Sequence, residues 1–317
     1  LELGAGFDGD LTVRENVYLR GALLGYTKEY VNEEYGKIIE FAELQEFEHV
    51  AFKKLSSGMK SRLAFSIACL VSPDILILDE PTAMLDPKAV FEDQLEKCGV
   101  DYGVLLPVAT KPTQQTTINN WAKDEYKGRF ISFGAVHPFA EDACDELDRI
   151  KSLGLKGVKL HNDYQGVFIF DERCKPIYKR CEELGLPIVF HMGYDPVSPR
   201  VHRAMPYDLL ELHENYPKLK IIGAHMGGEE AWESVYHYIA GVPNIWLDTA
   251  FTAGIIDEKL FYEIVKKHGT DRILFGSDLP WSSPDREIAL IDRLPVSSEC
   301  KEKIYWKNIA ELLELSL

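Results

Sequence analysis

Three histidines and an aspartate follow short apolar runs in the second half of the sequence. His161 ends the run GVKLH, His191 ends PIVFH, His225 ends KIIGAH, and Asp278 ends RILFGSD. A lone histidine at a strand end is usually a polar residue leaving the core. The carboxyl ends of parallel barrel strands meet on one face, so three such histidines and an aspartate are expected to converge there.

Two imidazoles and a carboxylate in one pocket can together bind a metal ion. Imidazole nitrogens and carboxylate oxygens form a facial ligand set for Zn²⁺, Mn²⁺ or Fe²⁺. Such an ion polarises a carbonyl group and lowers the pKa of its bound water towards about 7. The pattern therefore favours an enzyme that uses a metal-activated water.

The elements that would position these residues follow from the periodicity. Short apolar runs alternate with amphipathic helical segments such as 171–185 and 206–217. This alternation predicts a parallel α/β sheet, and its regular spacing favours a (β/α)8 barrel of the TIM type over an open sheet. In this count the barrel lacks its own first strand. Seven strands are expected, at 102–108, 130–136, 157–161, 187–191, 220–225, 244–249 and 272–278.

At these residues the sequence resembles the amidohydrolase-related superfamily, in its branch of small metal-dependent hydrolases and carboxylate decarboxylases. The motifs KGVKLH, PIVFHMG, IIGAHMGG, PNIWLDTA and RILFGSDLPW occur in the family's order from about Phe91 onwards. The resemblance implies that His191, His225 and Asp278 bind one divalent metal ion. Zn and Mn are the first candidates for this ion.

The same resemblance implies roles for further residues. Asp278 would also move the proton of the attacking water, so it counts as catalytic together with His161, which would stabilise developing negative charge. Lys159 and Gln165 would face the substrate, and Trp281 would line the pocket mouth. The loop 193–206 contains basic residues that could clamp a carboxylate or simply be solvated; these are Arg200, His202 and Arg203.

One part of the family pattern is missing. The H-x-H motif that supplies two metal ligands from the first strand does not occur in the sequence. The apolar run ILILDE, residues 75–80, could occupy the vacant first-strand position and bring Asp79 or Glu80 near the metal. Alternatively, this run packs with the helical segment that precedes it.

The N-terminal region carries a second pattern, with helical periodicity followed by LSSGMKSRLAF and ILILDEPT. It resembles the ATP-binding subunits of ABC transporters, in the polysaccharide-exporter branch. The resemblance makes Ser57 and Gly58 part of the signature motif, Asp79 the Walker B aspartate and Glu80 the catalytic glutamate. No G-x-x-x-x-G-K-[ST] loop is present to hold the phosphates, so these residues are interpreted as a nucleotide-site remnant.

Two regions are therefore expected: a truncated, helix-rich ABC-type segment at 1–88 and an amidohydrolase-like barrel at 89–317. The expected function is metal-dependent hydrolysis of a small carboxylated substrate. Decarboxylation at the same site is an alternative, because the same ligands serve both reactions. An ABC nucleotide-binding fragment and a chimera without activity are the remaining alternatives.

The composition limits the classes of binding partner and the cellular compartment that are expected for this chain. The net charge of −16 argues against binding to nucleic acid or to an anionic membrane surface. No apolar run approaches the about 18 residues of a membrane span. Six cysteines without paired spacing fit a reducing compartment, so a cytoplasmic location is expected. A small-molecule substrate is the expected partner, and a homo-oligomer is left open.

Overall fold

The chain forms two compact units, Leu1–Asp93 and Gln94–Leu317, which are described separately. The boundary predicted between residues 88 and 89 lies outside the described residues and stays a prediction, as do the remnant residues Ser57, Gly58, Asp79 and Glu80. Within the described parts of the chain, no helix has the length and apolar character needed to cross a membrane. The computed structural model describes residues 7–23, 27–42, 44–55, 59–60, 63, 66–67, 92, 94–195, 198, 201–279 and 281–315.

The N-terminal unit is built around α1 (Val13–Leu23) and α2 (Lys28–Phe41), followed by the 3₁₀ turns η1 (Gln45–Phe47) and η2 (Phe52–Lys54). A capping box starts α1. The Thr12 amide donates to Glu15 Oε2 at 2.8 Å, and the Glu15 amide donates to Thr12 Oγ1 at 3.2 Å. The helices share an apolar core that consists of Val13, Val17, Val31, Ile38, Ile39, Ala42, Leu44, Phe52, Leu55, Leu63 and Ile67.

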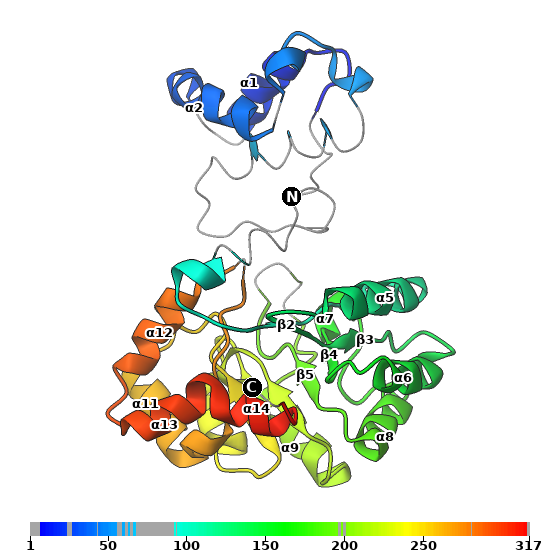
Figure 1. The fold of residues 1–317 in the computed structure, drawn as a ribbon, viewed down its shortest axis with the longest axis vertical. Helices are drawn as coiled ribbons and strands as arrows, with labels where there is room; N and C mark the ends of the chain where they lie inside the picture. Colours follow the sequence, from blue (N-terminus) through cyan, green and yellow to red (C-terminus); the bar gives the residue numbers. More distant parts are fainter. Residues whose placement is uncertain are drawn as a thin grey trace. The chain divides into compact units, whose positions relative to one another are not determined.

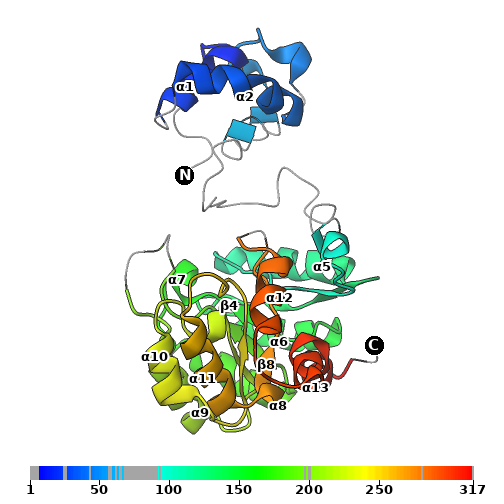
Figure 2. The same ribbon diagram turned by 90° about the vertical axis from the view of Figure 1, so that its left-hand side faces the viewer.

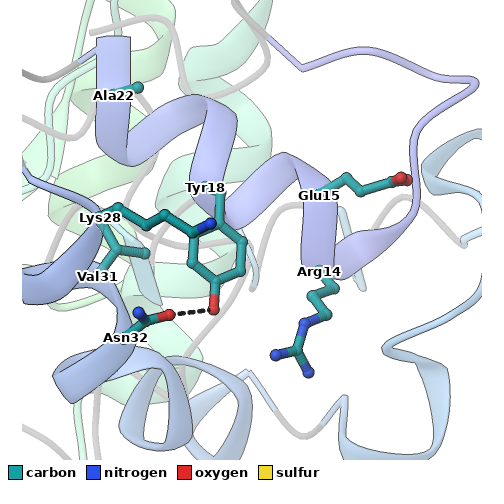
Figure 3. A pocket seen from close by; sticks show the side chains of 7 residues that line it. All are labelled: Arg14, Glu15, Tyr18, Ala22, Lys28, Val31 and Asn32. Atoms are coloured by element: carbon teal, nitrogen blue, oxygen red, sulfur yellow. Dashed lines mark hydrogen bonds between the residues drawn. The ribbon is translucent and has the colours of Figure 1, made fainter.

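A pocket of about 580 Å³ lies between α1 and α2 (Figure 3). In it the Tyr18 hydroxyl donates to Asn32 Oδ1 at 2.7 Å. Arg14, Glu15 and Lys28 give the walls mixed charge.

The C-terminal unit contains parallel strands in the order of the sequence. One sheet pairs β1 with β2, and the other has the order β3-β4-β5-β6-β7-β8. The Phe133 amide donates to Leu105 O at 3.0 Å, and the Gly134 amide donates to Gly157 O at 2.8 Å, so residues 130–135 connect the two sheets. The strands are β1 (Gly103–Leu105), β2 (Phe130–Ser132), β3 (Gly134–Ala135), β4 (Val158–Leu160), β5 (Ile188–Phe190), β6 (Ile221–Gly223), β7 (Ile245–Asp248) and β8 (Ile273–Leu274).

This topology confirms the predicted fold. Each of the seven expected ranges contains strand residues, and all the pairings are parallel. Among the described residues no strand joins β8 to β1, which is where a barrel's first strand would pair. The run 75–80, proposed for that position, lies outside the described residues.

Helices surround the strands in both ribbon views (Figures 1 and 2). Apart from β2, which continues into β3 after one residue, each strand is followed by a helical segment. The helical segments are η4 (Pro112–Gln114), α5 (Gln115–Glu125), α6 (Ala143–Ser152), α7 (Asn162–Gln165), α8 (Lys175–Leu184), α9 (Pro206–Asn215), η5 (His225–Gly227), α10 (Trp232–Ser234), η6 (Val235–Ile239), α11 (Glu258–His268), η7 (Thr270–Arg272), α12 (Pro284–Asp292), α13 (Ser298–Glu302), η8 (Lys303–Lys307) and α14 (Asn308–Leu312).

Alternation along the strands separates two cores. Residues such as Ile188 and Phe190 of β5 belong to the large core that the strands share with the helices. Val189, between them, belongs to a smaller inner core together with Ile222 and Leu274. Because side chains on a strand alternate between its faces, Lys159 of β4 shares the inner parity with Val189. The strands thus direct polar residues into the barrel interior.

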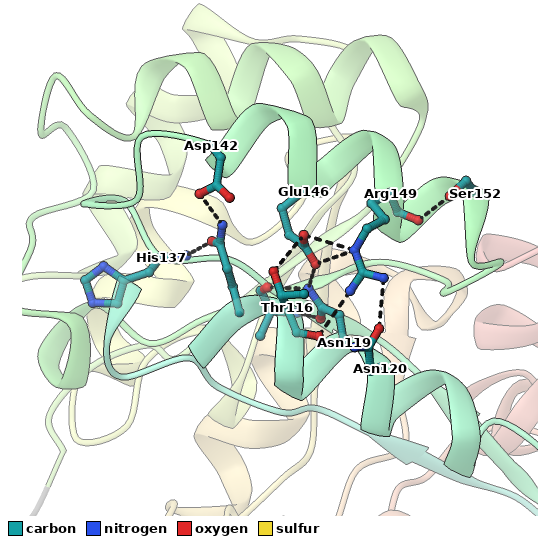
Figure 4. A network of polar contacts seen from close by, with 10 residues as sticks. Thr116, Asn119, Asn120, His137, Asp142, Glu146, Arg149 and Ser152 are labelled. Carbon is teal, nitrogen blue, oxygen red and sulfur yellow. Dashed lines mark hydrogen bonds and ion pairs between the residues drawn. The ribbon is translucent and has the colours of Figure 1, made fainter. Parts of the chain in front are cut away.

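A polar network fixes the edge of β3 against α5 and α6 (Figure 4). Asn119 of α5 donates to Ala135 O at 2.9 Å and accepts from the Ala135 amide at 2.7 Å, so its side chain acts like a neighbouring strand. Asn119 also donates to Glu146 at 2.7 Å, and Glu146 accepts from Arg149 at 3.1 Å. The buried Glu146 carboxylate is therefore fully partnered, and it joins both helices to the sheet.

Candidate metal centre

His191 and His225 face each other at the carboxyl ends of β5 and β6. His191 Nδ1 lies 3.0 Å from His225 Nε2, and both rings are buried. The other nitrogen of His225, Nδ1, lies 3.0 Å from Ala250 O and must carry the proton to donate there. His225 Nε2 is therefore an unprotonated nitrogen that faces a second imidazole.

The pair leaves one nitrogen unsatisfied in either tautomer of His191. If His191 Nδ1 carries the proton, Nε2 is a buried acceptor without a hydrogen-bond partner; if Nε2 carries it, two lone pairs face each other. Two imidazole ligands at about 2.1 Å from one ion, at right angles, have nitrogens about 3.0 Å apart. The observed separation is that of an N–H···N hydrogen bond and is equally compatible with two ligands of a single ion.

Glu229 brings a carboxylate to the same place. Ligand atoms of His191, His225 and Glu229 lie within 4.8 Å of one another, and all three residues are buried. A parallel bridge holds the backbone, because Glu229 N donates to Met192 O at 2.9 Å and Glu229 O accepts from Tyr194 N at 3.1 Å. These three residues form a candidate site for a divalent metal.

Asp248, at the end of β7, fixes the turn that carries His225. Its Oδ1 accepts from the His225 amide at 3.0 Å and from the Ala250 amide at 3.1 Å. Trp232 Nε1 donates to His225 O at 2.9 Å. Burial raises the pKa of Asp248, while the charges of His225 and Lys159 oppose that shift. Asp248 thus orients the histidine rather than merely ending a strand.

Lys159 and Asp278 lie in the same interior. Burial lowers the pKa of Lys159, and the negative charges of Asp248 and Asp278 raise it again. Burial raises the pKa of Asp278 to about 6 despite the charge of Lys159. Neither side chain makes a hydrogen bond or an ion pair within 4 Å of its charged atoms in the described part of the chain. Asp278 is not in the three-residue cluster, so its role as a metal ligand stays a prediction.

His161 lies directly over His191. The two rings stack with their centroids 4.0 Å apart, and Tyr164 stacks on the other side at 3.7 Å. The Tyr164 amide donates to His161 Nδ1 at 3.4 Å, which leaves the proton on Nε2. Burial is the main cause that lowers the pKa of His161, so the ring is neutral at pH 7.

Gln165 has contacts that differ from the predicted ones. Its Nε2 donates to Ala109 O at 3.0 Å and to Val136 O at 2.8 Å, and its Oε1 accepts from the His161 amide at 3.2 Å. Both amide hydrogens are used by the backbone, so Gln165 connects the ends of successive strands. Its contact with substrate stays a prediction.

The loops around the site hold the remaining predicted residues. The Trp281 amide donates to Asp278 O at 2.7 Å, which places Trp281 in the turn after β8. Arg203 NH1 donates to Asp163 Oδ1 at 2.9 Å, so this arginine already has a carboxylate partner. His202 Nε2 lies 3.4 Å from the Tyr194 hydroxyl. Arg200 lies outside the described residues.

Backbone strain accumulates at the same strand ends. His225, Met226 and Asp278 have φ values of 57°, 52° and 59°, which are uncommon for residues other than glycine. Strained positions of this kind cluster at functional sites in proteins. Their occurrence at the ends of β6 and β8 supports the location of the site.

Sequence reasoning missed two buried carboxylates, Glu229 and Asp248. Asp248 ends the apolar run NIWLD, so the strand-end pattern that singled out Asp278 would also have found it. Glu229 follows a glycine pair in the loop after β6. No periodic signal marks a loop residue, and its position depends on pairing with Gly193.

The parallel strands carry a candidate metal cluster at their carboxyl ends, which is where the active sites of α/β barrels lie. The amidohydrolase family model matches residues 72–315, and the chain belongs to that family. Similarity to solved structures supports the fold. A dihydroxybenzoic acid decarboxylase from Polaromonas sp. JS666 with bound manganese is 20% identical, with 75% of this chain and 90% of that chain covered and a TM-score of 0.57.

A second solved structure is similar over more of the chain. It is the 5-carboxyvanillate decarboxylase LigW2 from Novosphingobium aromaticivorans with bound manganese, 18% identical, with 88% of this chain and 94% of that chain covered and a TM-score of 0.60. At this level of identity the likeness concerns the fold alone.

The N-terminal region matches a different family. The ABC transporter model covers residues 3–83. The O-antigen export system ATP-binding protein RfbB of Klebsiella pneumoniae is 49% identical over 86 residues, which are 27% of this chain and 35% of that protein. The chain thus spans about a third of the length of this relative. The two family matches share residues 72–83, which include the run ILILDE.

Proposed function

We propose that the C-terminal unit is a metal-dependent hydrolase that acts on a small carboxylated substrate. The observation that carries the proposal is the buried pair of His191 and His225, whose facing nitrogens lie 3.0 Å apart without a proton arrangement that satisfies both rings. Zn²⁺ and Mn²⁺ suit imidazole and carboxylate donors, so they are the proposed metals. When bound, such an ion supplies Lewis acidity and lowers the pKa of water.

Lys159 is the proposed receptor for the carboxylate of the substrate. Its ammonium group is buried and lacks a hydrogen-bonding anion among the described residues. A buried cation without a partner is costly, and a carboxylate that binds there removes part of this cost. Burial lowers the pKa of Lys159, and the negative charges of Asp248 and Asp278 act in the opposite direction and favour its charged form.

Asp278 and His161 are the proposed catalytic groups. The Asp278 carboxyl has a pKa of about 6, so it can accept and return a proton near neutral pH. His161 carries its proton on Nε2, because Nδ1 accepts from the backbone. This N–H is available to donate to negative charge that develops on the substrate.

Decarboxylation is the second candidate. The two manganese-containing structures named above are decarboxylases, and they have a similar fold. The same Lys159 would hold the carboxylate, and Asp278 would deliver the proton that replaces it. The two reactions differ in their products, so a product assay separates them.

The test begins with the metal content of the full chain after purification and reconstitution with Zn²⁺ or Mn²⁺. We expect about one ion per chain, lost in the double variant His191→Ala/His225→Ala. His237→Ala is the matched control, because His237 is an exposed histidine outside the cluster. A parent chain that retains no metal would contradict the proposal.

The loaded chain is then incubated with a panel of small aromatic and aliphatic carboxylates, including esters, lactones and amides. Release of an alcohol or amine, or opening of a lactone to its hydroxy acid, without CO₂ supports the hydrolase. Release of CO₂ with a protonated product supports the decarboxylase and overturns hydrolysis. Lys159→Met should raise KM for the accepted substrate by a larger factor than it lowers the affinity for the metal.

A further inference from the structure

The candidate metal cluster contains a third possible ligand besides His191 and His225. We propose that Glu229 is a direct metal ligand, and that its carboxylate occupies a coordination position left vacant by the missing H-x-H pair. The inference rests on the proposed metal-dependent function and identifies the third ligand of that site.

The first argument is the location of the carboxylate. A ligand atom of Glu229 lies within 4.8 Å of ligand atoms of both His191 and His225, and the residue is 6% exposed. Ligands of one ion are about 3.0 to 3.4 Å apart for nearly tetrahedral or right-angled arrangements. A glutamate side chain has three rotatable bonds, so its carboxylate can approach an ion by a change of rotamer.

The second argument is that the backbone of Glu229 is held beside His191. Gly193 and Glu229 form a parallel bridge, and the amide and carbonyl of Glu229 are both hydrogen bonded to residues that flank Gly193. Since Gly193 follows His191 by two residues, the loop after β6 is attached directly to the end of β5. The carboxylate is therefore placed by the same two strands that place the imidazoles.

The third argument is that the carboxylate lacks another partner. No hydrogen bond or ion pair involves the side chain of Glu229 among the described residues. A buried carboxylate without a partner is costly, and a cation held between His191 Nδ1 and His225 Nε2 would partner it.

A ligand set of two histidines and Glu229 leaves Asp278 free for proton transfer. Asp278 lies outside the cluster within the described structure, while its charge still acts on Glu229 and Lys159. The set also places every ligand between β5 and the loop after β6. The site then needs no ligand from the N-terminal region, including Asp79 and Glu80.

The experiment is calorimetric titration of the metal-free full chain with Zn²⁺ and Mn²⁺. Glu229→Gln keeps the shape of the side chain and removes the charge, and we expect it to weaken binding on the order of 100-fold, since even outer partners of ligands contribute 10 to 100-fold. Glu229→Asp should restore part of the loss. Glu230→Gln, an exposed neighbour, is the matched control and should change affinity less than about 3-fold.

Two further variants separate the competing ligand sets. The double variant Asp79→Asn/Glu80→Gln should keep the affinity within about 3-fold of the parent, and Asp278→Asn should weaken binding by a smaller factor than Glu229→Gln does. The inference is overturned if Glu229→Gln binds as tightly as Glu230→Gln. In that case metal binding that is still lost in His191→Ala/His225→Ala leaves the proposed function standing. A parent that binds no metal would instead remove the basis of both.

Discussion

Substitution of Gly193 by alanine should disrupt the backbone around the site, because the added methyl group has no space there. The φ of Gly193 is 90°, a conformation that side chains other than glycine rarely adopt, and a Cβ built there would lie 2.7 Å from Gly228 C and closer still to the backbone N and O of Glu229. Backbone atoms cannot rotate away as a side chain does. Gly193→Ala must therefore push the two chain segments apart.

The expected cost has two parts. Placing a residue with a Cβ at positive φ costs about 1–2 kcal/mol. Separation of the segments also breaks the bonds from Glu229 N to Met192 O and from Tyr194 N to Glu229 O, at about 1 to 1.5 kcal/mol each. The free energy of unfolding of the C-terminal unit should fall by about 3–5 kcal/mol.

Gly185 provides the matched control. It ends α8 at a φ of 66°, and a Cβ there would meet no atom within 4 Å. Gly185→Ala thus carries only the conformational cost, about 1–2 kcal/mol. The difference between the two variants isolates the close approach of Gly193 to Glu229.

The assay is urea unfolding followed by tryptophan fluorescence in the presence of a chelator. All five tryptophans lie in the C-terminal unit, so the signal reports that unit and not the N-terminal helices. The chelator removes any stabilisation by bound metal. If Gly193→Ala unfolds within about 0.5 kcal/mol of Gly185→Ala, the two segments are not in close contact and the described bridge is wrong.

The remaining predictions use the same fluorescence signal. Asn119→Ala removes two hydrogen bonds to Ala135 and one to Glu146, and should destabilise the unit by about 3 kcal/mol. Asn120→Ala removes only one exposed hydrogen bond, from Arg149, and should cost about 1 kcal/mol or less; equal effects would contradict the network. Burial lowers the pKa of His268 to about 4, below its unfolded value of about 6.5. His268 therefore contributes at most about 3 kcal/mol to the free energy of unfolding. This contribution is fully present above pH 6.5 and is lost as the pH falls through 4. His268→Gln should flatten this part of the stability profile, and an unchanged profile would show that other groups cause it.

The sequence by itself predicted the fold of the C-terminal unit. Alternation of apolar strands and amphipathic helices predicted the parallel barrel, because that pattern depends on local burial and not on distant contacts. It also predicted that His191 and His225 would meet, since residues at the carboxyl ends of neighbouring parallel strands share one edge. The spacing of Lys159 and His161 by two residues gave them the same face of β4.

Tertiary structure decided which polar groups join the site. Glu229 lies beside His191 only because the loop after β6 pairs with Gly193, a contact between segments 36 residues apart. Gln165 has the same strand-end location as the site residues, yet its amide is used by Ala109 and Val136, whose carbonyl groups come from other loops. Such partners are set by the path of the chain in space. Local patterns in the sequence carry no information about that path, and so the strand ends were predictable while the loop carboxylate was not.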